Sequence, residues 1–207
     1  MRMIDLFSGL GGASEAFAQN GWHVTRIDNN PIFGIGGEHE VEGTIVKDVM
    51  TLEKWNPGNV DFLWASPPCY EFSLAYSAPR AIAMREGIDF EPDMTLLEQT
   101  IKLIEQYKPR YWCIENVLGA SKFFSEKLGR HRIKLGSALL WGNFPIIGLE
   151  ALETKYKKKE RDKHRRSKIR SNEVAKIPYW MSEQMRISVQ YQMTIDDFAE
   201  SLPKSRG

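Results

Sequence analysis

Cys69 and Glu115 have the types and positions that nucleophilic attack on an electron-poor ring requires. Cys69 follows an apolar run and two prolines in the stretch ASPPCYEFS, and Glu115 lies in a second apolar run, RYWCIENV. Because prolines fix their own backbone and restrict the residue before them, the cysteine is held stiffly. A thiolate that adds to carbon 6 of a cytosine ring needs an acid near ring nitrogen 3. Taken separately, Cys69 also fits a tight turn and Glu115 a turn cap.

A glycine-rich turn precedes both residues, in the stretch IDLFSGLGGASEAF. The pattern predicts a strand, a turn and a helix, and glycines there let a ligand approach the backbone and the helix N-terminus. Asp28 ends the next expected strand, 17 residues after Gly11, where an acid can bind ribose hydroxyls. Ser14 replaces the last glycine of the dinucleotide fingerprint. On spacing alone, a nicotinamide enzyme, an S-adenosylmethionine enzyme and a turn that merely needs glycine all remain open.

Three carboxylates at neighbouring strand ends favour S-adenosylmethionine. Asp5 lies inside the first expected strand, and Asp48 ends the third at the same edge as Asp28. These acids suit a cofactor with a cationic amino acid end and ribose hydroxyls better than a pyrophosphate. Because a buried carboxylate is costly without a partner, we expect Asp5 to be paired with a cationic group or with amides of the turn.

The elements that position these residues alternate between apolar strands and amphipathic helices. The alternation predicts an α/β fold with a mostly parallel central sheet and helices on both faces. Strands are expected at 3–7, 22–28, 42–49, 60–65, 110–117 and within 138–148, and helices at 12–21, 95–108 and 121–128.

Length and composition predict one domain over residues 1–207, with a net charge of only +1. The charge is uneven, because residues 155–170 hold ten Lys or Arg against two acids. Such a run attracts a phosphate backbone, although it is also typical of a solvated segment. The sequence shows no membrane span, disulfide framework or metal cluster, so we expect a cytoplasmic protein without a metal. Cys113 is expected to be an inert core residue.

These motifs resemble the cytosine-5 DNA methyltransferases. DLFSGLGG resembles the family's cofactor motif, SPPCYEFS its nucleophile loop and ENV its glutamate motif, in the family's order. Ser66 stands where glycine is usual and Tyr70 where glutamine is usual. The resemblance implies a Rossmann-like S-adenosylmethionine-dependent fold in which Cys69 attacks the base and Glu115 engages it.

The resemblance also implies a set of cofactor contacts, with Phe7 on the adenine, Asp28 on the ribose and Asp48 on the adenine amine. The full set is Asp5, Phe7, Ser8, Gly9, Leu10, Gly11, Gly12, Asp28, Asn29, Asp48, Val49, Ser66, Pro68 and Asn172. Asn172, in SNEVAKIP, is matched to an asparagine that precedes a helix beside the first strand.

Two features depart from the family. Its glutamine-x-arginine-x-arginine motif has GRHR as the nearest candidate, which makes Arg130 and Arg132 candidate catalytic residues without the glutamine. A basic insertion or loop at 151–176 stands in place of a target-recognition domain, and 177–192 is expected to be a helix packed back on the sheet. Arg80 and Arg85, after the cysteine, are candidate phosphate ligands or solvated residues.

The sequence therefore predicts a DNA (cytosine-5)-methyltransferase that uses S-adenosylmethionine, yields S-adenosylhomocysteine and acts on a flipped-out cytosine, as in restriction-modification. One alternative is a catalytic subunit or remnant that needs a separate recognition partner or only binds DNA. Another is the same chemistry on RNA or a free nucleotide, and a third is a nicotinamide dehydrogenase.

Overall fold

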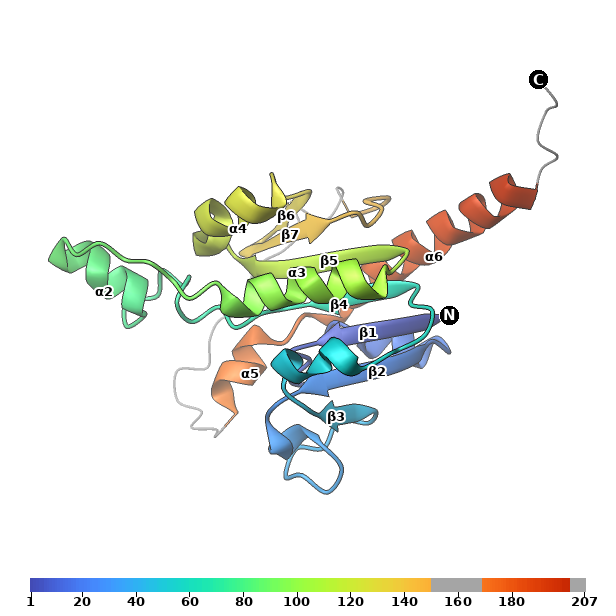
Figure 1. Cartoon of the computed structure of the whole chain (residues 1–207), viewed down its shortest axis with the longest axis horizontal. Helices are drawn as coiled ribbons and strands as arrows, with labels where there is room; N and C mark the ends of the chain where they lie inside the picture. Colours follow the sequence, from blue (N-terminus) through green and yellow to red (C-terminus); the bar gives the residue numbers. More distant parts are fainter. Residues whose placement is uncertain (150–168, 202–207) are drawn as a thin grey trace.

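A computed structural model of the chain describes residues 1–149 and 169–201 and contains a seven-stranded sheet (Figure 1). The strand order is β3-β2-β1-β4-β5-β7-β6. The strands are β1 (Arg2–Leu6), β2 (His23–Asp28), β3 (Thr44–Val46), β4 (Phe62–Ala65), β5 (Tyr111–Val117), β6 (Ile133–Leu135) and β7 (Ala138–Gly142).

The strands from β1 to β5 pair in parallel, whereas β7 runs antiparallel to β5 and β6 antiparallel to β7. The expectation of an α/β fold with a mostly parallel sheet is confirmed. Of the expected strand region at 138–148, only 138–142 forms a strand, and β6 completes a hairpin that the sequence pattern did not predict.

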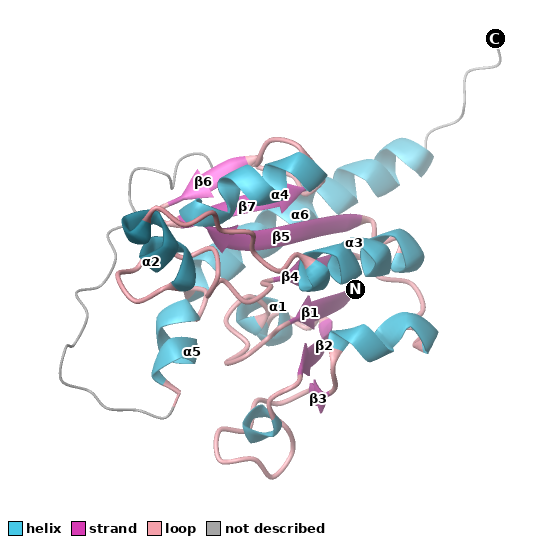
Figure 2. Cartoon of the chain, turned by 60° about the vertical axis from the view of Figure 1, so that its left-hand side comes forward, coloured by secondary structure: helices cyan, strands magenta, loops and turns pink. Residues whose placement is uncertain are grey.

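Helices cover both faces of the sheet because each strand presents apolar side chains alternately to either side (Figure 1, Figure 2). On β4, Phe62 and Trp64 belong to the core that includes Met185, whereas Leu63 belongs to the core that includes Leu103. The helices are α1 (Glu15–Gln19), α2 (Pro79–Glu86), α3 (Thr95–Tyr107), α4 (Ser121–Leu128), α5 (Arg170–Ala175) and α6 (Tyr179–Ser201), with short 3₁₀ segments η1 (Pro31–Phe33), η2 (Val49–Lys54) and η3 (Leu118–Ala120).

The last described helix, α6, lies behind the sheet and extends nine residues beyond the expected 177–192 (Figure 1). Its buried Ser182 hydroxyl accepts from the Ala16 amide at 3.1 Å and donates to the Ala13 carbonyl at 2.7 Å. At its other end, Asp197 pairs with Arg110 at 2.7 Å, which fixes α6 at the start of β5. The helix is therefore fastened at both ends of the sheet.

Most of the basic segment predicted at 151–176 lies outside the described residues, and its end forms α5. No helix within the described ranges combines the length and apolar character needed to cross a membrane.

Replacing Ser182 with Ala removes the hydroxyl that joins α6 to α1 and leaves buried backbone groups without partners. Because an unpaired buried group costs about 1–3 kcal/mol, we expect the free energy of unfolding to fall by about that amount, measured by urea denaturation. Thr194→Ala on the exposed face of α6, where the hydroxyl bonds only to the Gln190 carbonyl, is the matched control and should change stability by less than about 0.5 kcal/mol. Equal losses in the two variants would contradict this account.

Candidate active site

The parallel strands bring the predicted site residues to one edge of the sheet. Leu6 of β1 is in register with Ala65 of β4, and Ala65 is in register with Ile114 of β5. The next residues, Phe7, Ser66 and Glu115, therefore lie at the same level, just past the carboxyl ends of β1 and β4, while β5 continues to Val117. Ligands of open parallel sheets bind outside this edge.

Glu115 lies close enough to Cys69 at this edge to influence the ionisation of the Cys69 thiol. Burial raises the pKa of the Cys69 thiol, and the negative charge of Glu115 raises it further. Burial also raises the pKa of Glu115 to about 7, although a hydrogen bond with the Ser66 side chain opposes the rise. Glu115 is therefore partly protonated near neutral pH, which is the form that can donate a hydrogen bond.

The loop that carries Cys69 is fixed by buried hydrogen bonds. The Asn116 side-chain amide donates to the Pro67 carbonyl at 2.9 Å, and the Trp64 indole donates to the Ser66 hydroxyl at 2.8 Å. The sequence pattern indicates no separate role for Asn116. Its burial (1% exposed) beside Glu115 is the signal that marks it as a support of the loop.

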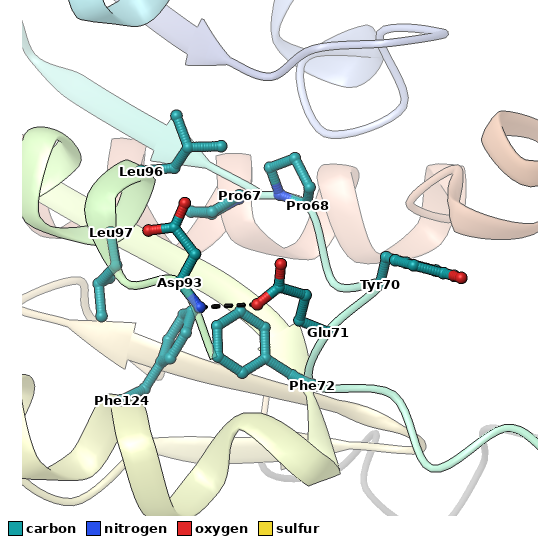
Figure 3. Close-up of a pocket in the computed structure, with 9 residues that line it drawn as sticks. All are labelled: Pro67, Pro68, Tyr70, Glu71, Phe72, Asp93, Leu96, Leu97 and Phe124. Atoms are coloured by element: carbon teal, nitrogen blue, oxygen red, sulfur yellow. Dashed lines mark hydrogen bonds between the residues drawn. The ribbon is translucent and has the colours of Figure 1, made fainter. Parts of the chain in front are cut away.

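A pocket of about 220 Å³ opens between this loop, the start of α3 and α4 (Figure 3). The Glu71 carboxylate crosses its rim and accepts a hydrogen bond from the Asp93 amide at 2.6 Å. This bond ties the residues after Cys69 to α3. The pocket is lined by Pro67, Pro68, Tyr70, Glu71, Phe72, Asp93, Leu96, Leu97 and Phe124.

The glycine turn after β1 has a strained backbone and is held by Asp28. Phe7 has φ +59°, a left-handed conformation that is rare for an aromatic residue and costs roughly 1 kcal/mol or more, and Gly9 and Gly11 have φ +47° and +68°. One carboxylate oxygen of Asp28 accepts from the Gly9 amide at 2.8 Å, and the other accepts from the Asn30 amide at 2.9 Å. Strain of this kind concentrates at ligand sites.

The surroundings of the turn fit a bound ligand. The Ser8 hydroxyl is buried and has no hydrogen-bond partner within the described residues. A side chain at Gly9 would approach the Asn172 amide nitrogen at 3.5 Å, and one at Gly12 would meet the Ile177 carbonyl at 2.5 Å. The structure therefore brings Asn172, distant in sequence, next to the turn.

The other residues of the predicted cofactor set surround this turn at different depths. Asp48 is exposed at the start of η2, where it accepts from the Met50 amide at 2.9 Å. Val49 is buried and Asn29 is exposed. Leu10 is half-buried, and Pro68 is exposed on the nucleophile loop.

Asp5 lies behind the turn and is only 1% exposed. The Ser14 hydroxyl donates to its carboxylate at 2.6 Å, and the Arg26 Nε donates to the Ser14 hydroxyl at 2.8 Å. Burial raises the pKa of Asp5 to about 6, while Ser14 and Arg26 oppose the rise. The partner of Asp5 is therefore the Ser14 hydroxyl with the Arg26 cation behind it, and not the directly bound cation or turn amides that the sequence predicts. The sequence pattern indicates no such role for Ser14 or Arg26.

The candidate arginines Arg130 and Arg132 lie on the segment before β6, where the Arg132 amide donates to the Leu140 carbonyl at 2.8 Å. Arg130 and Arg132 are exposed before β6, and β7 lies between β6 and β5. The Arg132 guanidinium lies over the Phe144 ring, 5.6 Å from its centre. Arg80 donates to the Gly119 carbonyl, and Arg85 lies 4.1 Å from the centre of the Tyr76 ring.

The second cysteine, Cys113, is fully buried in β5. Burial raises the pKa of its thiol well above the ordinary value, so it is unreactive in the folded chain. Within the described residues, no group of three or more His, Cys, Asp or Glu could hold a metal ion.

Comparison with known proteins gives a family match over residues 1–134, to the family described as C-5 cytosine-specific DNA methylase. The Type II methyltransferase M1.HphI of Haemophilus parahaemolyticus is 27% identical over 141 residues, which cover 64% of this chain and 36% of that protein. DNA (cytosine-5)-methyltransferase 1 of Gallus gallus is 30% identical over 138 residues, covering 56% of this chain and 8% of that protein.

A solved structure from E. coli, described as a DNA modification methyltransferase encoded within a prophage, is 22% identical with a TM-score of 0.41. The match covers 60% of this chain and 34% of the solved chain. The chain thus spans about a third of the length of M1.HphI and 28% of the Type II methyltransferase M.DdeI of Desulfomicrobium norvegicum.

The coupling of Cys69 and Glu115 predicts a pH-dependent effect of Glu115→Gln on thiol reactivity. Above pH 7 the Glu115 carboxyl is ionised and raises the pKa of Cys69, so removing its charge should speed alkylation of Cys69 by iodoacetamide about three- to tenfold at pH 8. Near pH 5.5 Glu115 is protonated and the two proteins should react at similar rates. Mass spectrometry of the labelled peptide gives the rates.

The matched control is Glu105→Gln at an exposed position of α3, which should leave the rate of Cys69 alkylation unchanged at both pH values. Cys69→Ser should abolish labelling, because Cys113 is buried. Equal alkylation rates of the wild type and Glu115→Gln at pH 8 would show that the two groups are not coupled.

Proposed function

The chain belongs to the C-5 cytosine-specific DNA methylase family, and on this premise we propose that it transfers a methyl group from S-adenosylmethionine to carbon 5 of cytosine in DNA. The observation that carries the proposal is the position of the Cys69 thiol beside the half-buried Glu115, at the sheet edge that also carries the strained glycine turn. A thiol, a partly protonated acid and a ligand turn at one edge suit this chemistry.

The residues around the turn fit the cofactor. Ser8 has a buried hydroxyl with no partner in the described part of the chain, and Asp28 has a carboxylate at the end of the second strand. Asn172 places an amide next to Gly9, and Phe7 contributes an aromatic ring. When bound, S-adenosylmethionine supplies an electrophilic methyl group on a sulfonium.

The chain's own residues supply the activation of the base. Because a duplex hides its bases, the target cytosine is flipped out of the stack. The Cys69 thiol gives its proton to solvent and the thiolate adds to carbon 6, while the protonated Glu115 donates a hydrogen bond to nitrogen 3. The electron pair displaced from the ring double bond makes carbon 5 nucleophilic toward the methyl group that bound S-adenosylmethionine would supply, with S-adenosylhomocysteine as the leaving group. A base then removes the proton from carbon 5, and the Cys69 thiolate leaves from carbon 6.

The buried environment sets the protonation states for this addition. The pKa of Glu115 near 7 keeps part of the population protonated at neutral pH. The raised pKa of Cys69 makes its thiolate scarce but strongly nucleophilic. Asn116 keeps the loop aimed through the Pro67 carbonyl.

A second candidate is the same catalytic domain acting with a separate recognition polypeptide. This candidate is favoured by the short length of the match to known proteins, because the chain spans 36% of M1.HphI and the family match ends at residue 134. In that case the chain alone would methylate exposed cytosines slowly and without sequence preference.

The test of the proposed function uses methyl-labelled S-adenosylmethionine with duplex DNA, single-stranded DNA, RNA and dCMP. We expect transfer to DNA by the wild type, no transfer by Cys69→Ser and a loss of at least about 100-fold in Glu115→Gln, because removing a positioned acid costs that much. DNA containing 5-fluorocytosine should form a covalent adduct on Cys69, because fluorine at carbon 5 cannot leave as a proton does.

Cys113→Ser is the matched control and should keep both activities, because Cys113 lies in the core. Transfer to RNA or dCMP in preference to DNA would show that the substrate is RNA or a free nucleotide and not DNA. The hypothesis that the chain is a methyltransferase fails if no substrate is methylated and no adduct forms. Binding of NADH in place of S-adenosylmethionine would overturn the cofactor assignment.

A further inference from the structure

Arg26 is a buried cation on β2, which lies between the edge strand β3 and β1. Its side chain is 7% exposed. Its Nε donates to the Ser14 hydroxyl at 2.8 Å, and another guanidinium nitrogen donates to the Glu42 carbonyl. Arg26 thus connects the start of α1 to the segment that leads into β3.

The guanidinium group also lies directly against the glycine turn. A Cβ atom at Gly11 would stand 2.8 Å from the Arg26 Nε and 3.3 Å from its Cδ. Gly11 has φ +68°, so neither its backbone conformation nor the space beside it accommodates another residue. The turn therefore packs directly against the Arg26 side chain at Gly11.

The Ser14 hydroxyl joins this cation to the buried Asp5. It lies 2.6 Å from the Asp5 carboxylate and 3.3 Å from the Gly11 carbonyl, and the Ser14 amide bonds to the same carbonyl at 3.2 Å. Two opposite charges thus meet on one hydroxyl, which sits at the end of the turn. This arrangement fixes the direction of Ser14 and the backbone before it.

Overall stability is a poor explanation for this network. Buried charges lose their hydration, and apolar side chains of similar volume often stabilise a fold as well or better. A fully hydrogen-bonded polar network instead specifies one local geometry. Here that geometry is the turn with the left-handed Phe7 and the unpartnered Ser8 hydroxyl.

We propose that Arg26 is a positioning residue for cofactor binding, which holds the turn from Phe7 to Gly12 in its binding shape through Ser14 and Asp5. The proposal rests on the proposed function, because it assigns the turn to S-adenosylmethionine. It gives Asp5 a role behind the turn, through Ser14, rather than a direct contact with the cofactor.

The test is calorimetric titration of S-adenosylhomocysteine into the full chain without DNA. Arg26→Met keeps an unbranched side chain but removes the donor, and Ser14→Ala removes the bridge. Each should raise Kd about tenfold or more, in line with the loss of a hydrogen bond to a charged group. Arg26→Lys, which keeps the charge, should lie between Arg26→Met and the wild type.

The matched control is Arg2→Met at the start of β1, where the guanidinium donates to the Pro57 carbonyl far from the turn. It should lower Tm without changing Kd by more than about twofold, as expected for sites that do not interact. The Kd of the double variant Ser14→Ala with Arg26→Met should exceed the larger of the two single-variant Kd values by no more than about twofold, because both residues act through one network.

An unchanged Kd in folded Arg26→Met and Ser14→Ala would overturn the proposal and leave Arg26 a structural residue. If Arg26→Met does not fold, Ser14→Ala decides alone, because it removes a single oxygen atom. Failure of the wild type to bind S-adenosylhomocysteine is a different result, which refutes the cofactor assignment of the proposed function itself.

Discussion

The parallel register of β1, β4 and β5 is the constraint on which the site depends. Because Leu6, Ala65 and Ile114 lie side by side, the glycine turn and the proline-cysteine loop leave the sheet at the level of Glu115 on β5. A shift of one residue in β5 would turn Glu115 to the other face of the sheet. The large buried side chains on both faces, among them Trp64 and Phe124, oppose such a shift.

The same packing that fixes the register also sets the electrostatics of the site. Burial makes the charged form of Glu115 expensive and brings its pKa to about 7, and the remaining negative charge acts on Cys69. Hydrogen bonds from Asn116 and to Asp28 then hold the loop and the turn where the two strands end. The carboxyl edge thus combines a nucleophile, an acid and a ligand turn on rigid elements, with α6 covering the opposite face of the sheet from α3 (Figure 1).

Much of this arrangement follows from sequence patterns, because apolar strands and the residues after them are local signals. The parallel sheet could be predicted in this way, and so could the common edge of Cys69 and Glu115. Contacts between distant residues could not be predicted: the sequence pattern indicates no role for Arg26, and only the fold places it against Gly11. The length of α6 was underestimated, because the ion pair between Asp197 and Arg110 that holds its far end joins segments distant in sequence.

We propose above all that Cys69 and Glu115 together activate a cytosine. Addition of the thiolate to carbon 6 allows carbon 5 to take up a solvent proton. A base then removes the original hydrogen from carbon 5 as a proton, and the Cys69 thiolate leaves from carbon 6. The most direct measurement is therefore the release of tritium from DNA carrying 5-tritiated cytosine, in the absence of S-adenosylmethionine. The account predicts release by the wild type and none by Cys69→Ser, with a strong reduction in Glu115→Gln. Release that persists in Cys69→Ser, or that is equal in all three proteins, would contradict it.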